Sequence, residues 1–196
     1  MTRSLALSAA ILVGTAVSFA APCRAQAQPQ ATNTAPKAAS PAPAEQLLAK
    51  AKAEARASGR TVFVRFTASW CGWCHLMEKT LDEPAVAELF RKHYVVVTLD
   101  VLEQGAKKAL ENPGGEGVMK ALGGEGQGIP FFAAVAPDGK KILDSRLMPK
   151  DQNIGCPATP EEVAAFGGFL EKTAPRLSAS DRAAILARFT ANAPKR

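Results

Sequence analysis

The chain has 196 residues, of which 47% are hydrophobic and 21% are charged, and its formal net charge is +6. This composition is typical of a soluble globular protein and excludes collagen-like, disordered and multi-span membrane chains. The lysines and arginines are interleaved with acidic residues and form no basic stripe with aromatic side chains, so the charge does not indicate nucleic-acid binding.

The first 25 residues have the pattern of an export signal. Arg3 supplies a positive charge, and residues 5–21 form an uncharged apolar stretch. Small residues near its end place signal-peptidase cleavage after Ala20 or Ala25. A membrane anchor is the alternative, but the stretch is short for a span and is interrupted by polar residues. We therefore expect an exported, periplasmic protein that is not inserted in the membrane once residues 1–25 are removed.

Residues 26–43 are rich in alanine, proline and glutamine and carry one charge, which predicts a flexible linker. A single α/β domain is expected at residues 44–192. Its expected helices span residues 45–58, 76–90 with a kink or break at Pro84, 107–111, 160–172 capped by Thr159, and 182–189 capped by Ser180. Its expected strands span residues 61–67, 94–99, 130–136 and 141–147.

The segment between the second and third expected strands, residues 101–128, contains eight glycines. No Gly-Lys-Ser/Thr ends it and no strand leads directly into it, so it does not match a phosphate-binding loop. Apart from its short helical stretch, we expect an irregular, elaborated connection.

The chemistry of the chain is concentrated at Cys71 and Cys74, which are separated by Gly72 and Trp73. This C-x-x-C lies between an expected strand and the start of an expected helix. At a helix N-terminus, free backbone N–H groups and the helix dipole favour a thiolate, and the thiolate is the nucleophile in disulfide exchange. Cys74 lies about one turn after Cys71 and is close enough to resolve a mixed disulfide. The spacing predicts a redox-active pair.

The sequence Ser-Trp-Cys-Gly-Trp-Cys at residues 69–74, after the strand at 61–67, resembles the active site of the thioredoxin superfamily. Gly128-Ile129-Pro130 resembles the cis-proline loop of that family, and the motif resembles more narrowly the exported thioredoxin-like proteins of bacteria. The resemblance implies a thioredoxin fold, a central mixed sheet of about four to five strands flanked by helices, here with a glycine-rich insertion and an extra C-terminal helix. It also implies a cis Ile129–Pro130 bond beside the sulfurs. The substrate-binding surface that it implies consists of Trp70, Gly72, Trp73, Ile129 and Pro130.

The function implied by the resemblance is a thiol–disulfide oxidoreductase that exchanges disulfides with exported protein substrates, Cys71 attacking and Cys74 resolving. It requires no cofactor or metal, but a redox partner, expected to be membrane-bound, must reset the dithiol. The direction of exchange stays open, because Arg65 occupies the position of a buried aspartate of the family and Gly-Trp replaces Gly-Pro at residues 72–73.

Two other functions fit the same residues. The sequence from Cys71 to His75 is also a C-x-x-C-H motif, the attachment pattern of c-type haem, for which Met77, Met119 or Met148 could be a second iron ligand. The strand-rich pattern argues against haem, because small c-type cytochromes are mostly helical. The second alternative is a thioredoxin-like binding module without turnover. A zinc site lacks the second C-x-x-C or the paired histidines that it needs.

Cys156 is a further cysteine, in the sequence Gly155-Cys156-Pro157 that leads into the helix at residues 160–172. In thioredoxin-like folds this loop borders the active-site cysteines. One hypothesis is an auxiliary thiol that forms a transient disulfide with Cys71. The alternative is a semi-buried loop thiol without a redox role.

Overall fold

The computed structural model of the protein describes residues 40–195. The expected export signal and residues 26–39 of the expected linker lie outside the described residues. Within residues 40–195, no helix has both the length and the apolar character needed to cross a membrane.

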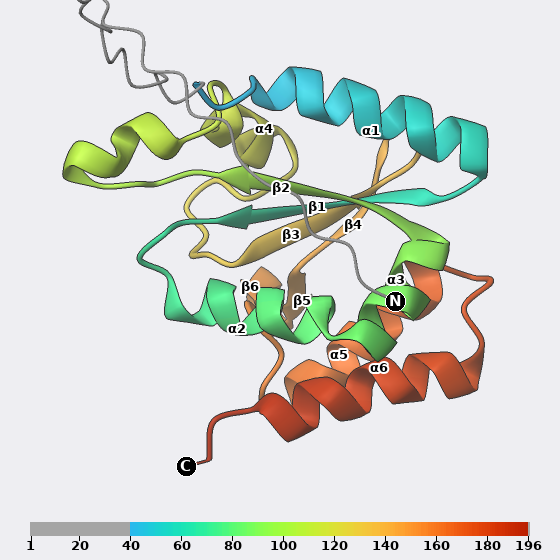
Figure 1. Ribbon diagram of the computed structural model, residues 1–196. Helices are drawn as coiled ribbons and strands as arrows, with labels where there is room; N and C mark the ends of the chain where they lie inside the picture. The colour runs from blue at the N-terminus through green and yellow to red at the C-terminus, as the bar shows by residue number, and fades with distance from the viewer. Residues whose placement is uncertain (1–39, 196) are drawn as a thin grey trace, which may run out of the picture. The chain divides into compact units, whose positions relative to one another are not determined.

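A mixed four-stranded sheet with the strand order β2-β1-β3-β4 forms the centre of the domain (Figure 1). β1 pairs in parallel with β2 and antiparallel with β3, which in turn pairs antiparallel with β4. The strands are β1 (Thr61–Thr67), β2 (Tyr94–Asp100), β3 (Phe131–Val135) and β4 (Lys141–Asp144). All of β3 is buried and hydrophobic, as is typical of a strand covered on both faces.

Helices cover both faces of this sheet (Figure 1). One face is covered by α1 (Ala44–Ser58) and by the short α4 (Gly115–Ala121). The other is covered by α2 (Gly72–Asp82), α3 (Pro84–His93), α5 (Pro160–Thr173) and α6 (Ala179–Asn192). Side chains alternate along a strand, so Val62 and Val64 of β1 face α1 while Phe63 faces α2 and α5. The α/β thioredoxin fold with an additional C-terminal helix is therefore confirmed.

Aromatic rings fill the second face. The ring of Phe63 has four aromatic neighbours at centroid distances of 5.0 to 6.0 Å, namely Phe90, Tyr94, Phe132 and Phe169. Aromatic side chains bury large apolar areas, and edge-to-face pairs add to this stabilisation. Met77 and Leu81 of α2 belong to the same buried cluster, which packs this helix against the sheet.

The single strand expected at residues 141–147 is wrong, because β4 ends before Ser145. The buried Ser145 hydroxyl accepts a hydrogen bond from the backbone N–H of Phe132 at 3.1 Å, and the Ser145 N–H donates to the Phe132 carbonyl at 2.9 Å. Beyond this point the chain leaves the sheet. It continues as β5 (Arg146–Met148), which forms a separate two-stranded sheet with β6 (Gln152–Asn153).

Two helical expectations also need correction. The connection at residues 101–128 is more ordered than expected, because it contains the 3-10 helix η1 (Gly105–Leu110) and the unexpected helix α4. α4 buries Val118 and Met119. The last helix begins earlier than expected, since its N-cap is Ser178, whose hydroxyl accepts from the N–H of Asp181. The break at Pro84 is confirmed, and it separates α2 from α3.

Candidate active site

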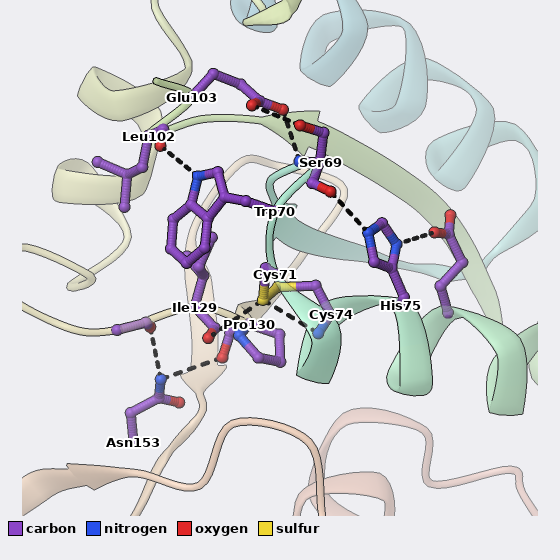
Figure 2. The surroundings of a disulfide bond; sticks show 12 residues. Ser69, Trp70, Cys71, Cys74, His75, Leu102, Glu103, Ile129, Pro130 and Asn153 are labelled. Carbon is purple, nitrogen blue, oxygen red and sulfur yellow. Dashed lines mark hydrogen bonds and ion pairs between the residues drawn. A yellow bond between two sulfur atoms is a disulfide. The ribbon is translucent and has the colours of Figure 1, made fainter. Parts of the chain in front are cut away.

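Cys71 and Cys74 form a disulfide at the N-terminal end of α2 (Figure 2). Cys71 is the N-cap of the helix, and its Sγ accepts a hydrogen bond from the Cys74 backbone N–H at 3.1 Å. A turn between β1 and α2, closed by the Cys71 N–H donating to the Ala68 carbonyl at 3.0 Å, places the motif there. The expected position at a helix N-terminus is confirmed. Such a position stabilises a thiolate on Cys71 once the disulfide is reduced.

The disulfide is recessed in the surface. Cys71 and Cys74 are 4% and 3% exposed, whereas Trp70 before the motif and Trp73 within it are 50% and 49% exposed. The space next to Gly72 is open, since an added Cβ would meet no atom within 4 Å. Large exposed aromatic side chains are typical of interaction surfaces. A reacting group must therefore reach the sulfurs from the surface that the two indoles border.

The proline loop packs directly against the disulfide (Figure 2). The Ile129–Pro130 bond is cis, as expected. The carbonyl oxygen of Ile129 lies 3.6 Å from Cys71 Sγ, and Ile129 packs against the buried cluster of Ala68, Cys71 and Cys74. The backbone of Ile129 and the Cys71 sulfur thus lie next to each other.

The segment after β2 holds the residues that precede Cys71 (Figure 2). The Trp70 indole Nε1 donates to the Leu102 carbonyl at 2.8 Å. The buried Glu103 carboxylate accepts from the N–H of Ser69 at 2.6 Å and from its hydroxyl at 2.8 Å. Leu102 has a φ of +57°, a left-handed conformation that non-glycine residues adopt at a cost. No local pattern indicates these contacts, because Glu103 is separated from Ser69 by 34 positions.

Arg65 makes an ion pair at the position where the resemblance implies a buried aspartate. It is 8% exposed and donates to the Thr98 hydroxyl at 2.7 Å and to a Glu78 carboxylate oxygen at 2.8 Å. The other oxygen of Glu78 lies 3.9 Å from Nδ1 of His75, whose Nε2 is 3.1 Å from the Ser69 carbonyl. The positive charge of Arg65 in β1 is thus neutralised by Glu78 of α2.

A groove of about 460 Å³ lies between Trp73, the proline loop and the segment at residues 152–162. Its lining includes Trp73, Ile129, Pro130 and Cys156, which the sequence had singled out, and Asn153 of β6, which it had not. Trp70 lies outside this lining, on the side of the motif next to Leu102. The structure therefore brings four of the expected residues to one groove, and Trp70 is not among them.

Comparison with protein families agrees with this geometry. A family model described as thioredoxin-like matches residues 44–137, which run from α1 through the disulfide and the cis proline to just beyond β3. The segment that holds the disulfide and the cis proline is therefore similar to the thioredoxin-like family. Comparison with curated proteins gives no match.

Several solved structures are similar to this thioredoxin-like chain. A disulphide isomerase from Xylella fastidiosa Temecula1 is 24% identical, with a TM-score of 0.45, over 75% of this chain and 91% of that one. A protein titled DsbH oxidoreductase is 17% identical, with a TM-score of 0.43, over 65% and 81% of the two chains. A thioredoxin from Thermus thermophilus is 23% identical, with a TM-score of 0.38, over 57% and 75%.

Cys156 is a free, buried thiol in this thioredoxin-like domain. Burial, and to a smaller extent the negative charge of Glu162, raises the pKa of Cys156 to about 12. The thiol is therefore neutral at physiological pH and a poor nucleophile. Its position in the groove beside Pro130 agrees with the loop placement that the resemblance implied. The transient disulfide with Cys71 stays a prediction.

The geometry does not favour the c-type haem alternative. Haem attachment needs each sulfur free to form a thioether, whereas Cys71 and Cys74 are bonded to each other and buried. The His75 ring is engaged by Ser69 and Glu78. Among the described residues, no three histidine, cysteine, aspartate or glutamate side chains cluster so that they could hold a metal ion.

Proposed function

We propose that the protein is a thiol–disulfide oxidoreductase that exchanges disulfides with exported protein substrates through Cys71 and Cys74. The observation that supports this best is the disulfide between them at the start of α2, with the Ile129 backbone beside it. A pair that only stabilised the fold would not need a helix N-terminus, exposed indoles or an adjoining groove.

In the reductive direction, the Cys71 thiolate attacks one sulfur of a substrate disulfide. The substrate S–S bond breaks, its second sulfur leaves as a thiolate and takes up a proton, and Cys71 is joined to the substrate. The Cys74 thiolate then attacks Cys71 Sγ, which forms the Cys71–Cys74 disulfide and releases the first substrate sulfur as a thiolate. Two electrons pass from the protein to the substrate, and oxidation of a substrate dithiol is the reverse.

The helix N-terminus contributes to both halves of this reaction. The Cys74 N–H that points at Cys71 Sγ stabilises negative charge on that sulfur. This favours the thiolate of Cys71 as a nucleophile and also makes that sulfur a better leaving group when a mixed disulfide is resolved. The positive charge of Arg65 is neutralised by Glu78 of the same helix, so it adds little to this stabilisation of Cys71.

The substrate-binding surface in this proposal consists of Trp70, Gly72, Trp73, Ile129 and Pro130. The two indoles are exposed and the disulfide is recessed, so the partner must present its sulfur on a protruding or extended segment. This requirement favours protein substrates.

Export to the periplasm and a membrane-bound partner complete the proposal. Both rest on the leader pattern at residues 1–25, which predicts a compartment without the cytoplasmic reductants. The partner must carry a dithiol or a disulfide that exchanges with the Cys71–Cys74 pair.

Catalysis of insulin reduction by dithiothreitol tests the proposal. The wild-type protein is expected to accelerate the reaction, and the Cys71→Ser and Cys74→Ser variants are expected to lose most of this effect. Cys156→Ser, a matched cysteine substitution outside the redox pair, should keep it. A wild-type protein that does not accelerate the reaction would indicate a binding module without turnover, and full activity in the double variant Cys71→Ser/Cys74→Ser would contradict the role of the pair.

The direction of exchange follows from the reduction potential of the pair, measured against glutathione. A value near about −270 mV would make the protein a reductant, and a value near about −120 mV would make it an oxidant.

A further inference from the structure

Asn153 of β6 binds the proline loop through its side chain (Figure 2). Its Nδ2 donates to the carbonyls of Gly128 at 2.8 Å and of Pro130 at 3.1 Å. Its Oδ1 accepts from the N–H of Gly155 at 3.1 Å. A primary amide has two N–H donors, and Asn153 uses both of them on the proline loop.

The two carbonyls that Asn153 binds are those immediately before and after Ile129. The carbonyl of Ile129 itself lies instead beside Cys71 Sγ, at 3.6 Å. The amide of Asn153 therefore fixes the backbone on both sides of the one peptide carbonyl that faces the reacting sulfur.

Little else fixes the loop at its N-terminal side. Gly128 is exposed, and a Cβ added there would meet no atom within 4 Å. Asn153 is by contrast well anchored, because it pairs with Arg146 of β5, and Arg146 donates to the Asp144 carboxylate at 3.1 and 2.9 Å. The side chain of Asn153 thus connects a weakly packed loop to a firmly held hairpin.

We propose that Asn153 is a positioning residue that holds the Ile129 backbone in place for pairing with the extended backbone of a protein substrate. The inference rests on the proposed function. Backbone pairing gives affinity for an extended peptide only when the edge that it meets is preorganised. Asn153 should therefore matter for protein substrates and not for small thiols, which need no backbone pairing.

Asn153→Asp is the most informative variant, since it keeps the shape of the side chain and removes both donors. Its carboxylate also repels the two carbonyls. We expect kcat/KM for reduction of fluorescently labelled insulin to fall about tenfold, through a higher KM with kcat nearly unchanged. The rate at which dithiothreitol reduces the Cys71–Cys74 disulfide, and the potential of that pair against glutathione, should stay as in the wild type.

The Asn112→Asp variant is the matched control. Asn112 also donates to a backbone carbonyl, that of Ala42, and accepts from a backbone N–H, that of Asp100, but it does not contact the proline loop. Its KM for insulin should stay as in the wild type. Asn153→Ala provides a second variant without the added charge, and thermal unfolding shows that each variant is folded.

Two results would overturn the inference. One is a wild-type KM for insulin in folded Asn153→Asp and Asn153→Ala. The other is an equal loss of rate with insulin and with dithiothreitol, which would indicate damage to the disulfide itself. A wild-type protein that neither reduces insulin nor exchanges its Cys71–Cys74 disulfide with glutathione would contradict the proposed function, and this result is visible before any variant is compared.

Discussion

At the scale of single residues, the buried carboxylate of Glu103 holds the backbone just before the C-x-x-C motif. It accepts both polar hydrogens of Ser69, two positions before Cys71. In Glu103→Ala the N–H of Ser69 would lose its partner in a buried site, which costs about 1–3 kcal/mol of the free energy of unfolding. Glu103→Gln should recover much of this loss, because one acceptor oxygen remains and the Ser69 hydroxyl can turn to accept.

Urea unfolding measures the loss of stability in Glu103→Ala and its recovery in Glu103→Gln. The fluorescence emission of Trp70 reports on the environment of the segment next to Ser69. Trp70 and Trp73 are the two tryptophans of the chain, so a Trp73→Phe background isolates Trp70. We expect the emission of Trp70 to shift in Glu103→Ala. Glu88→Ala, which removes an exposed ion pair with Lys92, should change neither quantity appreciably. An unchanged emission and stability in Glu103→Ala would contradict the role of Glu103.

The thiol of Cys156 should react slowly with alkylating reagents in the native protein. Its pKa of about 12, raised by burial and by Glu162, leaves a very small thiolate fraction at pH 8. With the Cys71–Cys74 pair oxidised, iodoacetamide should therefore label Cys156 slowly in buffer and rapidly in urea. Because the pKa is raised, the labelling rate should rise about tenfold per pH unit while the protein stays folded. Rapid labelling at neutral pH would contradict this prediction.

The auxiliary role of Cys156 has a separate test. In Cys74→Ser, the mixed disulfides of Cys71 are no longer resolved by their usual partner. If Cys156 takes over, it should be protected from alkylation after oxidation, acid quenching and denaturation. A fully alkylatable Cys156 under these conditions would rule out the transient disulfide.

The site was predictable from the sequence only where its residues are neighbours in the chain. Cys71, Cys74 and both tryptophans form one local motif, and Ile-Pro is recognisable as a pair. Glu103 and Asn153 are ordinary polar residues that reach the motif and the proline loop across 34 and up to 25 positions. Nothing in their own sequence surroundings distinguishes them from surface residues, and the fold alone makes them neighbours.

At the scale of elements, predictions from periodicity succeeded for long segments and failed where tertiary contacts decide. α4 escaped prediction because its glycines lower the helix propensity. The structure requires one of them, since a Cβ on Gly115 would lie 2.8 Å from a methyl group of Val101. β4 ends before Ser145, where the side-chain hydroxyl instead of a backbone carbonyl accepts from the N–H of Phe132 in β3. No local sequence pattern indicates this.

The link between β4 and the glycine-rich insertion gives a pH-dependent prediction. The Asp144 carboxylate accepts from Lys141 at 2.7 Å, and Lys141 also donates to the carbonyl of Leu122, just after α4. Burial opposes the charge of Asp144, but the hydrogen bonds from Arg146 and Lys141 outweigh it and hold the pKa of Asp144 below its ordinary value. The charged form is therefore favoured in the folded state.

A lowered pKa in the folded state stabilises the protein at pH values above the unfolded pKa of about 3.9. The stabilisation is lost as the pH falls through the folded pKa. Asp144→Asn should thus lower the free energy of unfolding by about 1–3 kcal/mol at pH 7, and by less at pH 3. Urea unfolding at the two pH values measures this, with Asp138→Asn in the exposed turn as control. An equal deficit at both pH values would mean that the charge of Asp144 is not responsible.

At the scale of the whole domain, the C-terminal helix α6 supports the helix that bears the cysteines. Asn192 donates to the Thr80 hydroxyl at 3.1 Å and to Glu83 at 2.6 Å, and Arg188 donates to Glu83 at 2.6 Å. These hydrogen bonds, that of Arg188 above all, lower the pKa of Glu83. Since Glu83 lies between α2 and α3, α6 holds the joint between these two helices. The family match ends at residue 137, so this support comes from outside the matched segment.

α6 should therefore be part of the cooperative core. Ile185 and Phe189 are 0% and 1% exposed, and the Phe189 ring lies 5.0 Å from that of Phe166 in α5. Phe189→Ala should lower the free energy of unfolding by about 3–5 kcal/mol, because it leaves a cavity among aromatic side chains. Leu110→Ala, at a 48% exposed position, is the control and should have little effect. Urea unfolding followed by tryptophan emission and by circular dichroism should give coincident transitions in both variants. If Phe189→Ala instead loses helical signal without a change in the main transition, α6 folds independently and does not support the redox helix.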